Sequence, residues 1–102
     1  MKTYEARTFG NVFVLEGGAR RILDPRLNLR NHSPTGLSWG FAGSGCAQLA
    51  LAILCDVYGD EKALRYYQQF NVEMIMTRDR DRPFEMTLAE VLGTVEYLES
   101  TA

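Results

Sequence analysis

The stretch from residue 44 to residue 58 most constrains what this chain can fold into, because it has the length of a helix and very few polar side chains. After its first turn only Gln48 and Asp56 interrupt the apolar residues. Ser44 is suited to cap a helix, and Gly59 stands where a helix often ends in a left-handed residue. A helix that is apolar on every side is buried. At about fifteen residues it is too short to span a bilayer, so we predict a fully buried central helix.

Two turn signals, Phe9-Gly10-Asn11 and Gly17-Gly18, divide the N-terminal part into three segments of strand composition. Glycine tolerates the positive φ angles that tight turns between antiparallel strands need. We therefore predict a three-stranded antiparallel meander. Because the middle segment is apolar at every position from Val12 to Leu15, we expect it to be covered on both faces. The three predicted strands are residues 3–8, 12–16 and 19–24.

A long connection, residues 25–43, joins this sheet to the central helix. Pro25 ends the last strand, and Ser33-Pro34-Thr35-Gly36 is a turn signal. Connections of this length are often functional or anchored by their own side chains. Trp39 and Phe41 are the predicted anchors.

The remainder of the chain predicts two further helices. Asp60 can cap the first, and helical spacing of its apolar residues favours a helix over the alternative of a strand from Val72 to Thr77. Thr87 and Glu90 form a capping box that opens the last helix. The predicted inward residues of the first helix are Ala63, Leu64, Tyr67, Phe70, Met74 and Ile75, and those of the last helix are Leu88, Val91, Leu92, Val95 and Leu98. Met86 and Val91 are the predicted hydrophobic staple. Residues 78–83 are predicted to be a solvated link.

These elements predict one α+β domain over residues 1–102, in which the N-terminal sheet packs against three helices. Thirteen acidic and eleven basic residues give a net charge of -2, which argues against non-specific binding of nucleic acid. The N-terminal residues lack the apolar run of a signal peptide, and no segment is long enough to span a membrane. We expect a cytoplasmic protein.

From Trp39 to Leu51 the chain reads Trp-Gly-Phe-Ala-Gly-Ser-Gly-Cys-Ala-Gln-Leu-Ala-Leu, and a Tyr-x-x-Phe segment follows at Tyr67. This pattern resembles a family of small proteins of unknown function found in bacteria, phages and mobile elements. Two positions depart from the family pattern: Leu37 replaces an aromatic residue, and Cys46 replaces a proline in the first helical turn. The resemblance implies a phage or prophage setting and brings no activity with it.

The glycine-rich run before the central helix is the first candidate site. Backbone N–H groups at a helix N-terminus can hold an anion, although this glycine spacing matches neither a P-loop nor a dinucleotide fingerprint. The alternative is close backbone packing around the tryptophan, with an ordinary helix cap. The candidate ligand-binding residues are Trp39, Gly43, Ser44 and Gly45, within the loop from Gly40 to Cys46.

Catalytic and metal sites find little support in this chain. Cys46 near a helix start would need a base to act as a nucleophile, and His32 is the one histidine. Two cysteines and one histidine at unrelated spacing do not predict a zinc site. Asp24 and the acidic residues of 56–61 stand at element ends, where acids commonly cap. We therefore expect no catalytic residues, no metal and no cofactor.

A cluster of basic residues, Arg20, Arg21, Arg26 and Arg30, is the second candidate site, as a surface for an acidic partner. No nucleophile, base and metal set converges in the sequence, so we predict a non-enzymatic protein. The predicted function is that of a phage or prophage accessory protein that binds a protein partner in a bacterial host, in the manner of an anti-CRISPR inhibitor of a host defence complex. The alternative is a small-molecule or nucleotide-binding domain that uses the loop from Gly40 to Cys46 and the helix N-terminus.

Overall fold

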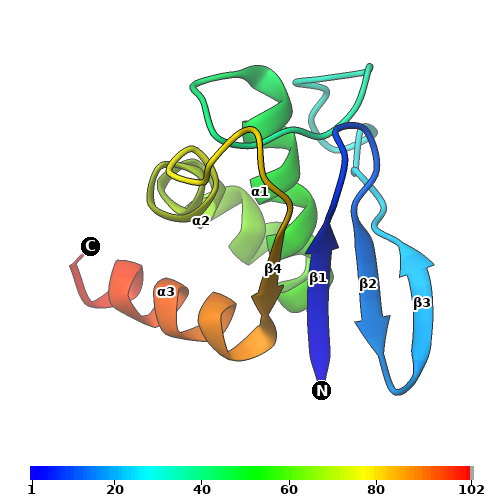
Figure 1. The fold of residues 1–102 in the computed structure, drawn as a ribbon. Helices are drawn as coiled ribbons and strands as arrows, with labels where there is room; N and C mark the ends of the chain where they lie inside the picture. The colour runs from blue at the N-terminus through cyan, green and yellow to red at the C-terminus, as the bar shows by residue number, and fades with distance from the viewer. Residues whose placement is uncertain (102) are drawn as a thin grey trace.

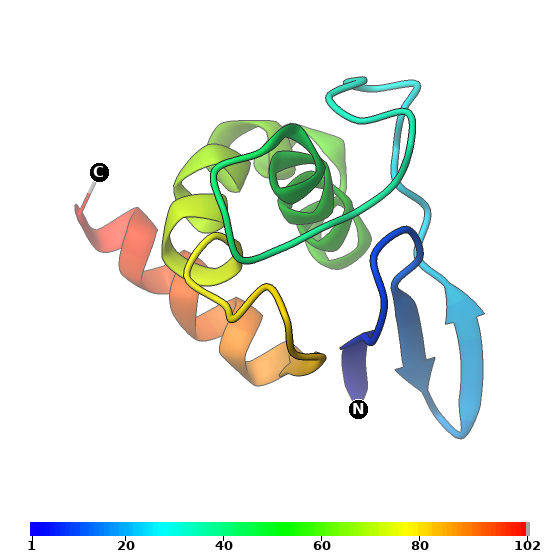
Figure 2. The same cartoon turned by 45° about the horizontal axis from the view of Figure 1, so that its top comes forward.

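The protein is a four-stranded antiparallel sheet packed against helices, as a computed structural model of residues 1–101 shows (Figure 1). In Figure 2, where the top of the molecule is turned forward, the helices again lie together on one side of the strands. No helix within these residues combines the length and the apolarity that crossing a membrane requires. In chain order the elements are β1 (Lys2–Ala6), β2 (Phe13–Glu16), β3 (Ala19–Ile22), α1 (Ser44–Tyr58), α2 (Asp60–Phe70), the π-helix η1 (Asn71–Ile75), β4 (Phe84–Thr87) and α3 (Leu88–Thr101).

The sheet has one strand more than the sequence predicts. Its order is β3-β2-β1-β4, so β1 lies inside the sheet and pairs with β4 from Thr3 opposite Thr87 to Ala6 opposite Phe84. The predicted meander of three strands is thus incomplete. The missing strand is only four residues long and follows Pro83, and nothing local distinguishes it from the lead into a helix. Its partner lies at the other end of the chain.

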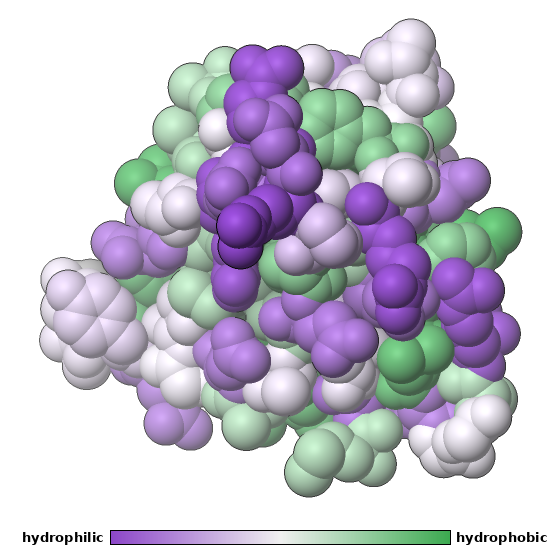
Figure 3. Space-filling view, viewed as in Figure 1, coloured by the Kyte–Doolittle hydropathy of each residue, from purple (hydrophilic) through white to green (hydrophobic). Residues whose placement is uncertain are grey.

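The two faces of the sheet differ in burial, which corrects the expectation for the middle strand. On the inner face Tyr4, Val14 and Met86 are fully buried. On the outer face Phe13 and Leu15 of β2 remain partly exposed, because no helix covers them there. Figure 3, viewed as in Figure 1, shows mainly hydrophilic side chains, with apolar ones among them, on the face of the molecule turned toward the reader. The strand is apolar on both faces, but only one face enters the core.

Helix α1 contributes the largest part of the core, yet it is not buried along its whole length as predicted. The ten residues from Gly45 to Leu54 are buried, whereas the last turn, residues 55–58, is partly exposed. Gly59 ends the helix as predicted and has a positive φ of 88°, but its ψ of 177° lies outside the predicted left-handed helical region. The predicted cap is wrong: Gly43 is the N-cap, and Ser44 is already the first helical residue.

Residues 60–75 are helical, so the alternative of a strand from Val72 is excluded. Their last turn is a π-helix, which the apolar spacing did not indicate. Asp60 is not the cap of α2, since Gly59 holds that position and the Asp60 carboxylate accepts a hydrogen bond from Arg26 at 2.7 Å.

The capping box at the start of α3 is confirmed. The Glu90 N–H donates to Thr87 Oγ1 at 3.1 Å, and the Thr87 N–H donates to Glu90 Oε1 at 3.4 Å. One member of the predicted buried stripe is misplaced, because Leu92 is 37% exposed. The helix packs instead on the row of Val91, Val95 and Leu98.

A charged cluster joins the exposed end of α1 to the sheet. The Asp56 carboxylate accepts hydrogen bonds from Tyr4 OH at 2.7 Å, from Arg21 at 2.8 Å and from Lys2 at 3.1 Å. Burial alone would raise the pKa of Asp56, but these three donors outweigh it and hold the pKa below its usual range. The Tyr4 hydroxyl is buried beside this carboxylate, and both effects raise the pKa of Tyr4.

We expect Asp56→Asn to lower the free energy of unfolding at pH 7 by about 1 to 3 kcal/mol, because it removes a charge that three donors share. A carboxyl whose folded pKa is depressed stabilises the fold above its unfolded pKa of about 3.9, and that contribution is lost as the pH falls through the folded value. The gap between wild type and variant should therefore shrink from pH 5 to pH 3 in urea titrations. Asp81→Asn, at a side chain that is 86% exposed, is the control. A gap independent of pH would contradict this role.

Candidate functional site

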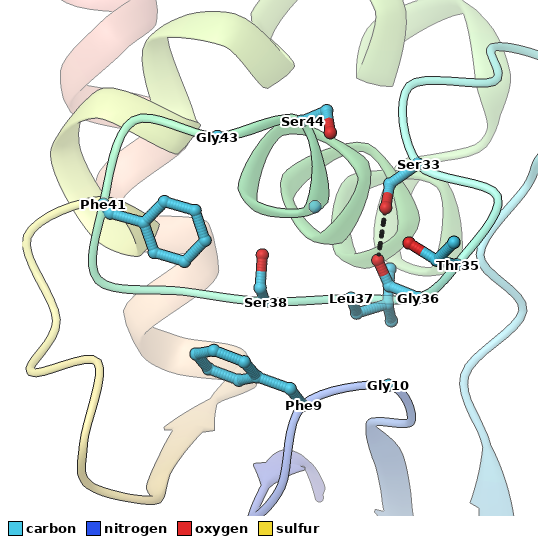
Figure 4. Close-up of a pocket in the computed structure, with 11 residues that line it drawn as sticks. Phe9, Gly10, Ser33, Thr35, Gly36, Leu37, Ser38, Phe41, Gly43 and Ser44 are labelled. Atoms are coloured by element: carbon cyan, nitrogen blue, oxygen red, sulfur yellow. Dashed lines mark hydrogen bonds between the residues drawn. The ribbon is translucent and has the colours of Figure 1, made fainter.

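A pocket with a volume of about 410 Å³ lies at the N-terminal end of α1. It is formed where the β1–β2 turn, the loop that follows Ser33 and the start of α1 meet (Figure 4). Phe9 and Phe41 lie on one side of it, and Ser33 and Thr35 lie on the other. The lining residues are Phe9, Gly10, Ser33, Thr35, Gly36, Leu37, Ser38, Phe41, Gly43, Ser44 and Gly45.

Two buried side chains, which we call braces, hold the loops that form the pocket. The first brace is Gln48, the one polar side chain inside the buried part of α1. Its amide oxygen accepts from the His32 N–H at 2.7 Å and from the Ser33 N–H at 3.2 Å. Its amide nitrogen donates to the carbonyls of Pro25 and of Arg30, the latter at 3.0 Å. One fully buried side chain thereby fixes both ends of the loop that leads into the pocket wall.

The second brace is Trp39, which is 1% exposed. Its indole N–H donates to the Arg82 carbonyl at 2.9 Å, and its ring stands edge-on to Phe9 and Phe84. Gly40, next in the chain, packs so tightly that a Cβ there would lie 2.4 Å from the backbone nitrogen of Arg80. Trp39 is therefore an anchor, as the sequence indicates, and does not line the pocket as the ligand-binding alternative proposed.

Phe9 and Ser38 are pocket residues that the sequence analysis missed. They meet because Gly10 and Leu37 form a β-bridge, in which the Gly10 N–H donates to Leu37 O at 2.8 Å and the Leu37 N–H donates to Gly10 O at 3.1 Å. This contact joins two loops far apart in the sequence. The turn signal at residues 33–36 predicted this loop, but it did not indicate that the loop pairs with the turn at Gly10.

The start of α1 presents polar groups to the pocket. The N–H groups of Cys46 and Ala47 both bond to the Gly43 carbonyl, whereas those of Ser44 and Gly45 have no backbone acceptor within residues 1–101. A Cβ at Gly45 would lie 2.2 Å from Ser38 Oγ, so only glycine fits there without a shift. The helix dipole places partial positive charge at the same end.

Hydroxyl groups and aromatic rings complete the lining. Ser33 Oγ donates to the Gly36 carbonyl at 2.7 Å. The other lining hydroxyls, those of Thr35, Ser38 and Ser44, have no carbonyl acceptor within residues 1–101. The rings of Phe9 and Phe41 have centroids 6.2 Å apart and are 47% and 37% exposed. The Arg80 guanidinium lies 5.5 Å from the Phe41 ring and brings a cation to the rim.

The thiol and the imidazole that the sequence offered as a catalytic pair are not together. Cys46 is fully buried, and its Sγ lies 3.7 Å from Ser38 Oγ. His32 Nε2 lies 2.8 Å from the Tyr67 hydroxyl instead. Burial raises the pKa of the other thiol, Cys55, to about 11, so that group stays protonated at neutral pH. Within residues 1–101 no group of three or more His, Cys, Asp or Glu side chains is placed to hold a metal ion.

The predicted arginine cluster is divided between the two faces of the sheet. Arg20 and Arg21 are neighbours on β3 and therefore point in opposite directions. Arg20 pairs with Glu5 at 3.1 Å on the outer face, and Arg21 pairs with Asp56 at 2.8 Å on the inner one. Hydrogen bonds from Arg7, and then from Arg20, hold the pKa of Glu5 below its usual value.

The other two members of the cluster lie in the connection before α1. Arg26 has a φ of 59° and pairs with Asp60 at 2.7 Å. Arg30 is exposed, and its guanidinium donates to the Leu29 carbonyl. Three of the four predicted cations are thus paired with carboxylates of this chain, and Arg20 and Arg21 lie on opposite faces of the sheet.

A family model described as a family of unknown function, DUF6166, matches residues 4–97. The chain belongs to this family. No curated protein and no solved structure matches the chain significantly. The match covers β2, β3 and β4 completely, most of β1 and most of the last helix, so it includes both braces and the pocket of this DUF6166 member. The family description assigns no activity.

Proposed function

We propose that this DUF6166 protein is a non-enzymatic binding domain that holds a small anionic ligand in the pocket at the start of α1. The observation that carries the proposal is the lining, which brings together two exposed aromatic rings, three hydroxyls and the N–H groups of Ser44 and Gly45, which have no backbone acceptor within residues 1–101. Pockets of several hundred Å³ that combine apolar walls with a few convergent polar groups are the usual form of small-molecule sites.

The lining also defines the chemistry of the ligand. An oxygen-rich acidic group would accept hydrogen bonds from Ser44 N–H, Gly45 N–H and Ser38 Oγ, with the helix dipole favouring its charge. A flat apolar part would rest on Phe9 and Phe41. A phosphate or carboxylate attached to a planar group, as in a nucleotide, meets both requirements.

We expect Ser44→Asp to abolish ligand binding while it leaves the fold as stable as the wild type or more so. A carboxylate in the first helical turn interacts favourably with the helix dipole, but it repels an anion at the same place. Thermal unfolding against a panel of phosphate, sugar phosphates and nucleotides measures this, because a ligand at one hundred times its Kd stabilises the wild type by about 2.7 kcal/mol, or several degrees.

Ser44→Asn is the matched control, since it has nearly the same shape without the charge and should keep its ligand-induced shift. A wild type that no member of the panel stabilises would contradict the proposal. So would an aspartate variant that is stabilised as much as the asparagine variant.

The partner-binding function predicted from the sequence, including inhibition of a host defence complex, is a second proposal. Its predicted arginine surface is unsuited to a simple test, because reversing the charge of Arg21 would also disturb Asp56 and so the stability of the fold. A different surface supports a protein partner better, and it lies between η1 and α3.

A further inference from the structure

Gly93 in the middle of α3 is a glycine for which the fold itself gives no reason. A Cβ at this position would have no heavy atom within 4 Å, and its φ is not in the left-handed region. Glycine inside a helix costs about 0.5 to 1 kcal/mol relative to alanine. A glycine that neither turns the chain nor relieves a contact leaves room for something outside the molecule to approach the backbone.

Gly93 lies in a groove of about 400 Å³ between η1 and α3. Met74 of η1 and Thr94 and Tyr97 of α3 line the groove with it, and the Tyr97 side chain is more than half exposed. The wall on the other side is a π-helical turn, a departure from α-helix that is frequent at functional sites. Met74 and Tyr97 give the groove apolar surface, and at Gly93 the helix backbone lies in the groove with no side chain over it.

The charges around this groove are acidic. Glu73 and Glu90 line it, and no lysine or arginine is among the lining residues. Arg78 approaches Glu90 at 3.8 Å, while the Glu73 carboxylate has no cationic partner within residues 1–101. Helix α3 contains no basic residue. A second copy of this helix in the groove would bring acid against acid, whereas a basic segment would complement it.

We propose that the groove between η1 and α3 docks an amphipathic helix of a partner protein, with apolar side chains against Met74 and Tyr97 and lysine or arginine side chains toward Glu73 and Glu90. A groove between two helices accepts a third helix through anchors spaced three and four residues apart. The helix backbone passes over Gly93, where any side chain would hold it away. This inference concerns a surface separate from the pocket and does not depend on its ligand.

The experiment uses a fluorescent leucine-lysine amphipathic peptide of about 18 residues, long enough to form a helix. We expect the protein to bind it, and Gly93→Leu and Glu73→Lys each to raise the Kd at least about tenfold in anisotropy titrations. Gly93→Ala should raise the melting temperature while it weakens binding, which separates loss of docking from loss of folding. NMR shifts of residues that line the groove would place the peptide.

Two variants are the controls. Ala89→Leu places the same leucine side chain at an exposed position of α3 that does not line the groove, and Glu96→Lys makes the same charge change on α3 away from it. Both should bind like the wild type. The proposal fails if the wild type does not bind the peptide or if the controls lose binding equally. It also fails if the protein self-associates in sedimentation experiments and Gly93→Leu reverses this, because the occupant would then be a second copy.

Discussion

Replacing Gln48 by leucine is expected to lower the free energy of unfolding by about 3 to 5 kcal/mol, enough to unfold much of a domain of this size at physiological temperature. Leucine keeps the volume and the apolar character of α1. It leaves two N–H groups, of His32 and Ser33, and two carbonyls, of Pro25 and Arg30, without their partner. The loss comes from those orphaned groups rather than from a cavity. Urea unfolding followed by circular dichroism measures it.

Gln69→Leu on α2 is the matched control, because Gln69 is exposed and none of its side-chain atoms forms a hydrogen bond within residues 1–101. It should change the stability by no more than about 0.5 kcal/mol. If the two substitutions had equal effects, the loop from Pro25 to Ser33 would not depend on the Gln48 amide. Rapid proteolysis of that loop in the Gln48 variant at low urea would support the dependence.

Gly40→Ala is expected to cost about 2 to 4 kcal/mol. The residue has a φ of 84°, and the added Cβ would lie 2.4 Å from the Arg80 nitrogen, so the segment that holds Trp39 would have to move. The strained φ alone accounts for only about 1 kcal/mol of this cost.

Gly18→Ala isolates that smaller part. Gly18 has a φ of 81° but no heavy atom within 4 Å of its Cβ position, so alanine there suffers the backbone strain without a collision. The difference between the two variants in thermal or urea unfolding reports the close packing at Gly40. Equal losses at both positions would show that the segment around Arg80 moves away freely.

Local signals predicted the helices and the first three strands because their causes lie within a few residues. The capping box of Thr87 and Glu90 and the glycine stop at Gly59 are such signals. The fourth strand was not predictable in this way, because Phe84 to Thr87 become a strand only by pairing with β1. The predicted N-caps, Ser44 and Asp60, were each one residue too late in the chain, because Gly43 and Gly59 hold the N-cap positions of α1 and α2.

The candidate sites were harder to predict than the fold, because they too depend on contacts between residues far apart in the sequence. Gln48 stood out in the sequence only as a polar interruption of an apolar helix, and nothing local identified the carbonyls and N–H groups that it binds. Arg20 and Arg21 look like one patch along the sequence, although alternation along a strand sends them to opposite faces. The pocket itself depends on the bridge between Gly10 and Leu37, a contact across the chain that no residue type announces.

The place of β1 between β2 and β4 has a consequence for how the protein is made. During synthesis β1, β2 and β3 leave the ribosome first and can form their hairpins, but Thr3 has to wait for Thr87 before the sheet is complete. Until then one edge of β1 carries unpaired backbone groups, and the apolar side chains of α1 lack their final cover. Such late, long-range pairing slows folding and exposes nascent chains to aggregation. A ribosome-bound chain that ends before residue 84 is therefore expected to be a substrate for chaperones, whereas one that extends past α3 is not.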